Sequence, residues 1–336
     1  MLKLLDKALW PEGQQQLTSI PQWLTEALSL PNSGCLTSPE SFFVSRTTGL
    51  NLHYRTYHPH SNHVVYFFHG LNDHCSKLQY TSLCTKISEE LNCTVKAMDM
   101  ISHGLSQSPG AHEHTKMIIS WEALVDDAAQ FVEESTHNKG VTFSFLAHST
   151  GGAIALCLHN LLSSRPEYKG LYSIAPLIHP PPIPSFVLCA LKTFLLCLPC
   201  LCSSSSLLSP PRKTDTEPWL VFSSPEAYRV EAVDDPLQWQ GKIPLGTGSV
   251  LIDFAKHVTN SVIPELSEKN VRPIKIVHGV EDGLVSVEGS RALTAAVEEA
   301  EIWEIEGERH VPLQGNLGEE VEKDIITWLK QNKTLH

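Results

Sequence analysis

The sequence predicts an α/β protein whose mostly parallel, doubly wound sheet is interrupted by an inserted cap, or lid, subdomain. Short apolar runs alternate with segments of helical periodicity through residues 41–175, and again from about residue 250. The run at residues 64–68 is apolar throughout, as expected for a strand that is covered on both faces. Residues 176–249 lose the alternation and are interrupted by prolines. We therefore expect an N-terminal arm at residues 1–40, a core at 41–175 and 250–336, and a cap at 176–249.

Each element of the core follows from the local pattern. Residues 41–46 and 50–58 flank a Thr47-Thr48-Gly49 turn, which predicts an antiparallel hairpin. Beyond the hairpin, apolar β-like runs predict strands, and apolar residues that recur at helical spacing predict helices. The further strands are expected at residues 64–68, 94–98, 141–146, 171–175, 273–277 and 301–305. The further helices are expected at residues 78–91, 121–136, 152–162, 287–300 and 319–330.

Composition limits the partners. Lys and Arg number 25 against 37 Asp and Glu, so the net charge is −12, which argues against nucleic acid and against electrostatic attachment to an anionic membrane. The nine cysteines are an odd number in no metal-like spacing, and charges interrupt the apolar residues of the first 16 positions, unlike a signal peptide. We expect a cytoplasmic protein with free thiols, no metal ion and no organic cofactor.

Residues 147–151, Ala-His-Ser-Thr-Gly, lie between the predicted strand at 141–146 and the predicted helix at 152–162. A serine in a tight strand-to-helix turn is exposed above the edge of the sheet and is typical of a nucleophile. The strand and the helix approach closely there, so small residues are needed two positions before and after the serine. Ala147 and Gly151 meet this need around Ser149, although glycine is the more usual residue at the first of them.

A serine hydroxyl needs a base to take its proton and donors to stabilise the oxyanion that forms. In hydrolases with this strand–serine–helix turn, the acid and the histidine follow the serine along the chain. Asp282 follows the predicted strand at 273–277, and His310 follows the one at 301–305. Both therefore lie at carboxyl ends of strands, where open sheets place their sites. We expect Ser149 to attack, His310 to act as base and then acid, and Asp282 to orient the histidine.

Other carboxylates are less suitable as the third member. Asp99 precedes the serine in the chain, and Asp253 lies at the exit of the predicted cap. Neither has the strand-end context of Asp282, and Glu281 is the nearest rival.

Two backbone N–H groups are expected to form the oxyanion hole. One belongs to Thr150, directly after the serine, and the other to Leu71, in the loop after the predicted strand at 64–68. Gly70 lets that loop turn. We expect His69, Gly70 and His148 to line the substrate site, and His69, His103 and His148 to shape their loops by hydrogen bonding without transferring protons.

These motifs resemble the monoglyceride lipase and lysophospholipase-like branch of the α/β-hydrolases, a group that is also classed with the serine aminopeptidase-like hydrolases. The matching segments span most of residues 41–330 and are residues 64–74, 98–106, 148–152, 234–237, 278–282 and 310. The resemblance implies the α/β-hydrolase fold, the triad of Ser149, Asp282 and His310, the oxyanion donors Leu71 and Thr150, and a cap over an acyl pocket. The chain departs from the group at residues 100–104, which lack the usual arginine and glycine before His-Gly, and at Thr150, which is often methionine.

Apolar stretches outside the core allow two interpretations. Residues 2–10 form a short amphipathic piece for which packing on the core is favoured over membrane contact. Residues 186–198 are apolar nearly all round, which favours a buried cap helix along the acyl pocket; a lid that dips into a bilayer is the alternative, and the two are compatible. Cys197, Cys200 and Cys202 are candidate acylation sites, but buried free thiols are commoner.

The sequence thus predicts a serine carboxylester hydrolase that acts on lipid-like or other apolar acyl esters, of monoacylglycerol or lysophospholipid type, through an acyl-serine intermediate. Its partner would be a small acyl ester, with peripheral membrane contact through the cap as an addition. An amidase, a peptidase or an acyltransferase on the same triad is the first alternative. A binding protein of the same fold without catalysis is the second.

Overall fold

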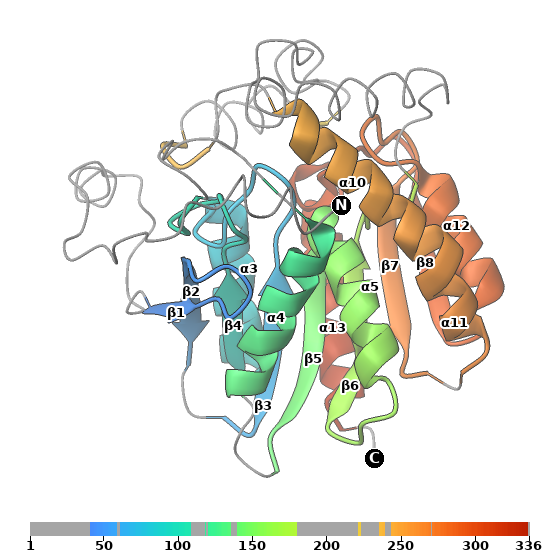
Figure 1. The fold of residues 1–336 in the computed structure, drawn as a ribbon. Helices are drawn as coiled ribbons and strands as arrows, with labels where there is room; N and C mark the ends of the chain where they lie inside the picture. Colours follow the sequence, from blue (N-terminus) through green and yellow to red (C-terminus); the bar gives the residue numbers. More distant parts are fainter. Residues whose placement is uncertain are drawn as a thin grey trace.

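The fold is taken from a computed structural model, in which residues 41–58, 61–108, 118, 120–135, 140–179, 221–222, 235–238, 243–269 and 271–334 are described. The predicted arm at 1–40, the apolar run at 186–198 and most of the predicted cap lie outside the described residues (Figure 1). The expectations about those segments therefore stay predictions.

In the described residues, eight strands form one sheet in the order β1-β2-β4-β3-β5-β6-β7-β8. The strands β1 and β2 pair antiparallel, and β2 pairs antiparallel with β4. All further pairs are parallel, so the predicted hairpin and the mostly parallel sheet are confirmed. The strands are β1 (Ser41–Val44), β2 (Asn51–Tyr57), β3 (His63–Phe68), β4 (Thr94–Met98), β5 (Thr142–His148), β6 (Tyr168–Ile174), β7 (Ile274–Gly279) and β8 (Ala300–Ile305).

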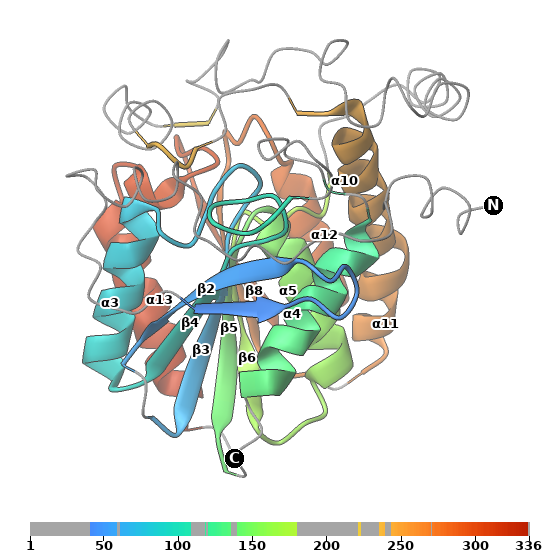
Figure 2. The ribbon, with the colours of Figure 1, turned by 60° about the vertical axis from the view of Figure 1, so that its left-hand side comes forward.

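Helices cover both faces of the sheet. The helices α3 and α13 lie on one face, and α4, α5 and α10 lie on the other, as Figure 2 shows. The helices are α3 (Leu78–Leu91), α4 (Trp121–Ser135), α5 (Thr150–Leu162), α10 (Leu245–His257), the π-helix η3 (Val258–Val262), α11 (Ile263–Ser267), α12 (Val287–Ala296), the 3-10 turn η4 (Pro312–Gln314) and α13 (Gly318–Asn332). Every helix that the pattern predicts in the core is present.

Three features differ from the predicted elements, and the first is β6, which begins at Tyr168, three residues before the predicted strand at 171–175. The helices α10, η3 and α11 follow one another without a break, and α10 crosses the boundary between residues 249 and 250. Their apolar residues pack against the same core cluster as α4 and α5. The helix α12 ends at Ala296, four residues before the predicted end, because Val297 takes an extended backbone conformation.

The sheet explains where the apolar residues of the strands go. All six residues of β3 are buried, and so are all seven of β6, because helices cover both faces. Four buried cysteines in the described residues are free thiols: Cys75, Cys84, Cys93 and Cys157. Within the described ranges, no helix combines the length and the apolar character that crossing a bilayer requires.

Candidate active site

Three loops and one tight strand-to-helix turn meet at the carboxyl edge of the sheet. The loop after β3 carries Leu71, and β5 runs directly into Ser149. The loop after β7 carries Asp282, and the loop after β8 carries His310. Residues that are far apart in sequence therefore share one edge, because parallel strands present all their carboxyl ends on the same side.

Ser149 occupies a strained backbone conformation between β5 and α5. Its φ is 55° and its ψ is −117°, outside the regions that non-glycine residues usually adopt. The N–H of Ser149 donates to the carbonyl of Ile174 at 2.9 Å, and its own carbonyl accepts from Gly152 and Leu177 at 2.9 Å each. The surrounding main chain thus holds the serine in this conformation.

Gly151 and Gly152 permit the close approach of helix to sheet. A Cβ on Gly151 would overlap the carbonyl of Phe68, and one on Gly152 would lie 2.7 Å from the Pro176 side chain. Ala147 is fully buried between β3 and β6. Small residues are needed on both sides of the serine for the reason that the sequence indicates, and alanine satisfies the first position.

Ser149, His310 and Asp282 form a hydrogen-bonded chain. The Oγ of Ser149 lies 2.9 Å from Nε2 of His310, and Nδ1 of His310 lies 2.6 Å from Oδ2 of Asp282. Ser149 and His310 are 7% and 5% exposed, so the chain is largely withdrawn from water. With Nδ1–H donating to the carboxylate, Nε2 is free to accept the serine proton.

Asp282 is held as an anion by several donors. Its Oδ1 accepts from the backbone N–H groups of Leu284 and Val285 at 2.7 and 2.9 Å, and Nε2 of His278 lies 3.2 Å from its Oδ2. Burial alone would raise the pKa of this carboxyl, but His310 and His278 outweigh burial and keep the pKa below its usual range. Burial lowers the pKa of His310, but the facing Asp282 reverses this and raises it above the usual value.

The loop that carries the expected oxyanion donor lies against the serine. A Cβ built on Gly70 would lie 3.0 Å from the Cβ of Ser149, so the Leu71 N–H follows directly after a residue in contact with the nucleophile. Thr150 is the first residue of α5, where backbone N–H groups point out of the helix and carry partial positive charge. Gly70 therefore lies against the Ser149 side chain, and Thr150 follows Ser149 in the chain, while the two oxyanion donors stay predictions.

The three histidines that are predicted to shape loops, His69, His103 and His148, each contact different groups. Nδ1–H of the fully buried His69 donates to the carbonyl of Gly70 at 2.7 Å, and its Nε2 accepts from Met100 N–H at 3.1 Å. Burial lowers the pKa of His69 to about 4, so the neutral ring shapes the loop. His103 contacts the carbonyl of Ile101 at 2.8 Å. The ring of His148 lies 5.0 Å from that of His310, within the site.

The rival carboxylates lie away from His310. Asp99 is fully buried and accepts from the N–H of Cys75 at 2.6 Å and of Leu105 at 3.0 Å. Asp253 is on α10, and Glu281 is exposed with its N–H bonded to the carbonyl of Glu308. The structure therefore brings Asp282, and not these three, to the histidine.

Sequence reasoning missed His278 behind Asp282, and the cluster of Asp73, Lys77 and Tyr80 beside His148. Asp73 and His278 fall inside the segments that carry the family resemblance, at residues 64–74 and 278–282. Their contacts join positions far apart in sequence, and no local spacing encodes such contacts.

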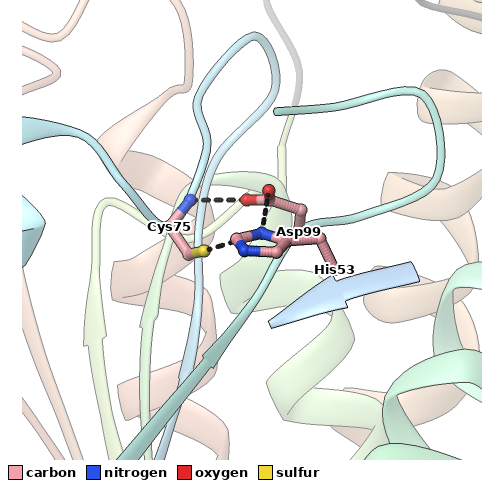
Figure 3. A group of neighbouring side chains, drawn as sticks. All are labelled: His53, Cys75 and Asp99. Atoms are coloured by element: carbon pink, nitrogen blue, oxygen red, sulfur yellow. Dashed lines mark hydrogen bonds and ion pairs between the residues drawn. The ribbon is translucent and has the colours of Figure 1, made fainter. Parts of the chain in front are cut away.

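One group in the described residues has the donor set of a metal site. His53, Cys75 and Asp99 lie together in the interior, with Nδ1 of His53 2.7 Å from Asp99 and 3.6 Å from the Cys75 sulfur (Figure 3). The Asp99 oxygens already accept two backbone N–H groups and the histidine, and burial raises the pKa of the Cys75 thiol. A Cβ on Gly104 would overlap this carboxylate, so space is also short. The group fits a hydrogen-bonded loop anchor better than a metal ion.

Comparisons with known proteins identify the family and agree with the fold. A family model described as serine aminopeptidase, S33 matches residues 59–314. The monoacylglycerol lipase of Paleococcus ferrophilus has a similar structure, with a TM-score of 0.63 and 23% identity over 84% of this chain and 99% of that one. A monoglyceride lipase of Saccharomyces cerevisiae, in complex with a substrate analog, has a TM-score of 0.68 and 17% identity over 97% of this chain and 100% of that one. A thermostable carboxyl esterase of Bacillus coagulans has a TM-score of 0.68 and 17% identity over 88% of this chain and 99% of that one.

Proposed function

The chain belongs to the serine aminopeptidase S33 family of α/β-hydrolases, and from this premise we propose that it is a serine carboxylester hydrolase. The observation that carries the proposal is the chain of contacts from Ser149 Oγ through His310 to Asp282, at 2.9 and 2.6 Å. Its substrate would be a lipid-like or other apolar acyl ester, of monoacylglycerol or lysophospholipid type. The structures of similar fold include two named as monoacylglycerol or monoglyceride lipases and one named as a carboxyl esterase.

The contacts among these residues support the following steps of ester cleavage. Nε2 of His310 takes the proton from Ser149 as its Oγ attacks the ester carbonyl, and Asp282 stabilises the imidazolium that forms. The N–H groups of Leu71 and Thr150 donate to the oxyanion of the tetrahedral intermediate. His310 returns the proton to the leaving alcohol, which departs from an acyl-Ser149. Water then attacks the acyl group with His310 again acting as base, and the acid and the free serine are released.

Amide hydrolysis and acyl transfer would use the same residues. Amide hydrolysis differs from ester hydrolysis in its leaving group, so rates on matched ester and amide substrates separate the two. Acyl transfer differs in its acceptor, an alcohol in place of water, so the products formed with an alcohol present separate it from hydrolysis. A non-catalytic binder would bind acyl esters without turnover. The strained Ser149 supports an enzyme, because such strain is kept where chemistry needs it.

Fluorophosphonate labelling tests the nucleophile. We expect the wild-type chain to react covalently and Ser149→Ala to remain unlabelled at the same concentration and time. Ser173→Ala is a matched control, because Ser173 is a fully buried serine on β6. Equal labelling of the wild type and Ser149→Ala would exclude Ser149 as nucleophile.

We also propose that residues 176–249 form a cap over this site, between the two parts of the core. Support comes from the few described residues of that segment. Val221 and Phe222 form a small apolar cluster with Val311, next to the histidine. The Arg309 guanidinium donates to the carbonyl of Phe222 at 3.1 Å. The segment thus contacts the loop that carries His310.

A cap of this kind could meet a lipid surface through its apolar run at 186–198, which would make a cytoplasmic enzyme peripherally membrane-associated. Co-sedimentation with neutral phosphatidylcholine vesicles tests this. The double variant Leu195→Asp with Leu196→Asp should bind less than the wild type. Equal partitioning of the two would leave the interpretation in which this run lines the acyl pocket.

A further inference from the structure

Asp73 is a buried carboxylate outside the three residues of the proposed triad. It is 8% exposed and lies in the loop that carries Leu71. Nζ of Lys77 lies 2.5 Å from its Oδ1, and the Tyr80 hydroxyl lies 2.7 Å from its Oδ2. Such a group is expensive to bury unless it is paired, and here it has both a cation and a hydroxyl as partners.

His148 joins this carboxylate to the catalytic histidine. Its Nδ1 lies 2.7 Å from the Tyr80 hydroxyl and 3.4 Å from Oδ2 of Asp73. Its Nε2 lies 3.0 Å from the backbone carbonyl of His310. A carbonyl can only accept, so Nε2 of His148 carries a proton and donates it there.

The contact fixes the main chain at the residue whose side chain must meet Ser149. His310 lies in a loop after β8, and β8 is an edge strand of the sheet, so regular pairing alone does not fix the position of its ring. His148 is the last residue of β5, a central strand, and it directly precedes Ser149. The nucleophile and the backbone of the base are thereby tied to one rigid point.

We propose that Asp73 and His148 are positioning residues: the buried carboxylate, with Tyr80, orients the His148 ring so that it holds the main chain of His310 against Ser149. This inference rests on the proposed function, since it names residues that serve the same site. Neither residue exchanges a proton with substrate.

The same cluster reaches into the segment proposed as the cap. Nζ of Lys77 donates to Oε1 of Gln238 at 3.2 Å, and Nε2 of His74 lies 2.7 Å from Asp235. Both contacts come from residues that follow Asp73 within four positions of chain. The position of residues 235–238 therefore affects Lys77, which pairs with the Asp73 carboxylate that orients His148.

Charge gives the proposal a second signature. The groups that face the His310 ring are Asp282 at 2.6 Å, His148 with ring centres 5.0 Å apart, and Asp73 through its field. Burial lowers the pKa of His310, whereas Asp282 and, to a smaller extent, Asp73 raise it. Removing the charge of Asp73 should lower this pKa, which a purely structural role in a distant part of the core would not do.

The test compares Asp73→Asn and Tyr80→Phe with the wild type. For both variants we expect kcat on an acyl ester to fall between about tenfold and 100-fold with a smaller change in KM, because misplaced catalytic groups lose rate at about that scale. For Asp73→Asn the acid limb of the kcat/KM profile should also move to lower pH. Tyr172→Phe is the matched control, because the Tyr172 hydroxyl bonds Asp324 at 2.7 Å in another part of the core.

An NMR titration of the His310 ring, assigned with His310→Gln, provides a readout without substrate. A lower midpoint in Asp73→Asn supports the proposal even if the wild type hydrolyses no ester and binds no fluorophosphonate, a result that would end the proposed function alone. An unchanged midpoint together with an unchanged kcat would overturn the positioning role. If Asp73→Asn does not fold, Tyr80→Phe decides: a kcat equal to that of Tyr172→Phe overturns the proposal, and a lower one supports it.

Discussion

Gly151 stands directly against the main chain of Phe68, so that a methyl group in place of its hydrogen would overlap that carbonyl oxygen. The same methyl group would lie 2.6 Å from the carbonyl oxygen of His69. Both atoms belong to backbone at the end of β3 and the start of its loop, and cannot swing aside as a side chain would.

Gly151→Ala should therefore destabilise the fold. We expect the free energy of unfolding to fall by about 2 kcal/mol or more, because overpacking against fixed atoms costs ~1–3 kcal/mol. Urea denaturation measures the change. Gly248→Ala, a helical glycine on α10 with open space around it, should be neutral or should stabilise by up to about 1 kcal/mol. Equal stability of the two variants would contradict the close approach.

Replacing the acid of the proposed triad should abolish most activity. Asp282→Asn keeps the size of the side chain but removes the charge that stabilises the His310 imidazolium, so kcat should fall on the order of 10³–10⁴-fold. Steady-state kinetics on the best ester substrate provides the measurement. Asp253→Asn alters the carboxylate on α10 and should keep wild-type kcat; a loss of comparable size there would reassign the acid.

His278 is predicted to matter through Asp282. His278→Phe removes the Nε2–H group 3.2 Å from the carboxylate, and kcat/KM should drop about tenfold, a usual scale for one charge-assisted hydrogen bond. His159→Phe removes a buried histidine that contacts the Tyr168 hydroxyl at 2.8 Å, elsewhere in the core. The His159→Phe protein that folds should keep the kcat/KM of the wild type. An equal drop in kcat/KM for His159→Phe and His278→Phe would indicate a general loss of structure.

Asp127 makes stability depend on pH. Burial raises the pKa of this carboxyl to about 6, which the hydrogen bond from Ser45 only partly opposes. Because the folded pKa is raised, stability is fully present below the unfolded value near 3.8 and is lost as pH rises through 6. At pH 7 we expect the free energy of unfolding of Asp127→Asn to exceed that of the wild type by on the order of 2–3 kcal/mol. At pH 4 the two proteins should have nearly the same free energy of unfolding.

Denaturation at both pH values checks this prediction. Glu122→Gln changes an exposed carboxylate on the same helix and should leave the pH dependence as it is. A pH dependence of Asp127→Asn identical to that of the wild type would show that Asp127 does not titrate differently in the folded state.

Much of the sheet could be predicted because each strand carries its own signal. The apolar run at 64–68 and the Thr47-Thr48-Gly49 turn can be recognised from the local sequence, and the run lies in β3 and the turn joins β1 to β2, as the pattern predicts. The order Ser149, Asp282, His310 follows from which loops lie at carboxyl strand ends. That rule depends on topology alone, which explains why three positions spread over 161 residues of chain could be named together.

The supporting contacts could not be predicted for a physical reason. The contact between His148 and the carbonyl of His310 spans 162 positions, and that between His74 and Asp235 spans 161. These depend on where loops settle, to within an ångström, after the sheet has formed. The continuous helix from α10 through η3 to α11 was also not predicted. Prolines before Leu245 obscure the start of this helix in the sequence, and tertiary packing determines how far it extends.

The position of His310, the proposed base, in the sheet order has a consequence for heat resistance. Ser149 follows the central strand β5, whereas Asp282 and His310 follow β7 and β8, the last two strands at one side. Peripheral strands open more easily than central ones, so fraying there would detach His310, the proposed base, while most of the molecule stays native. On warming, catalytic activity should then be lost several degrees below the melting temperature measured by circular dichroism. On cooling, the activity should return.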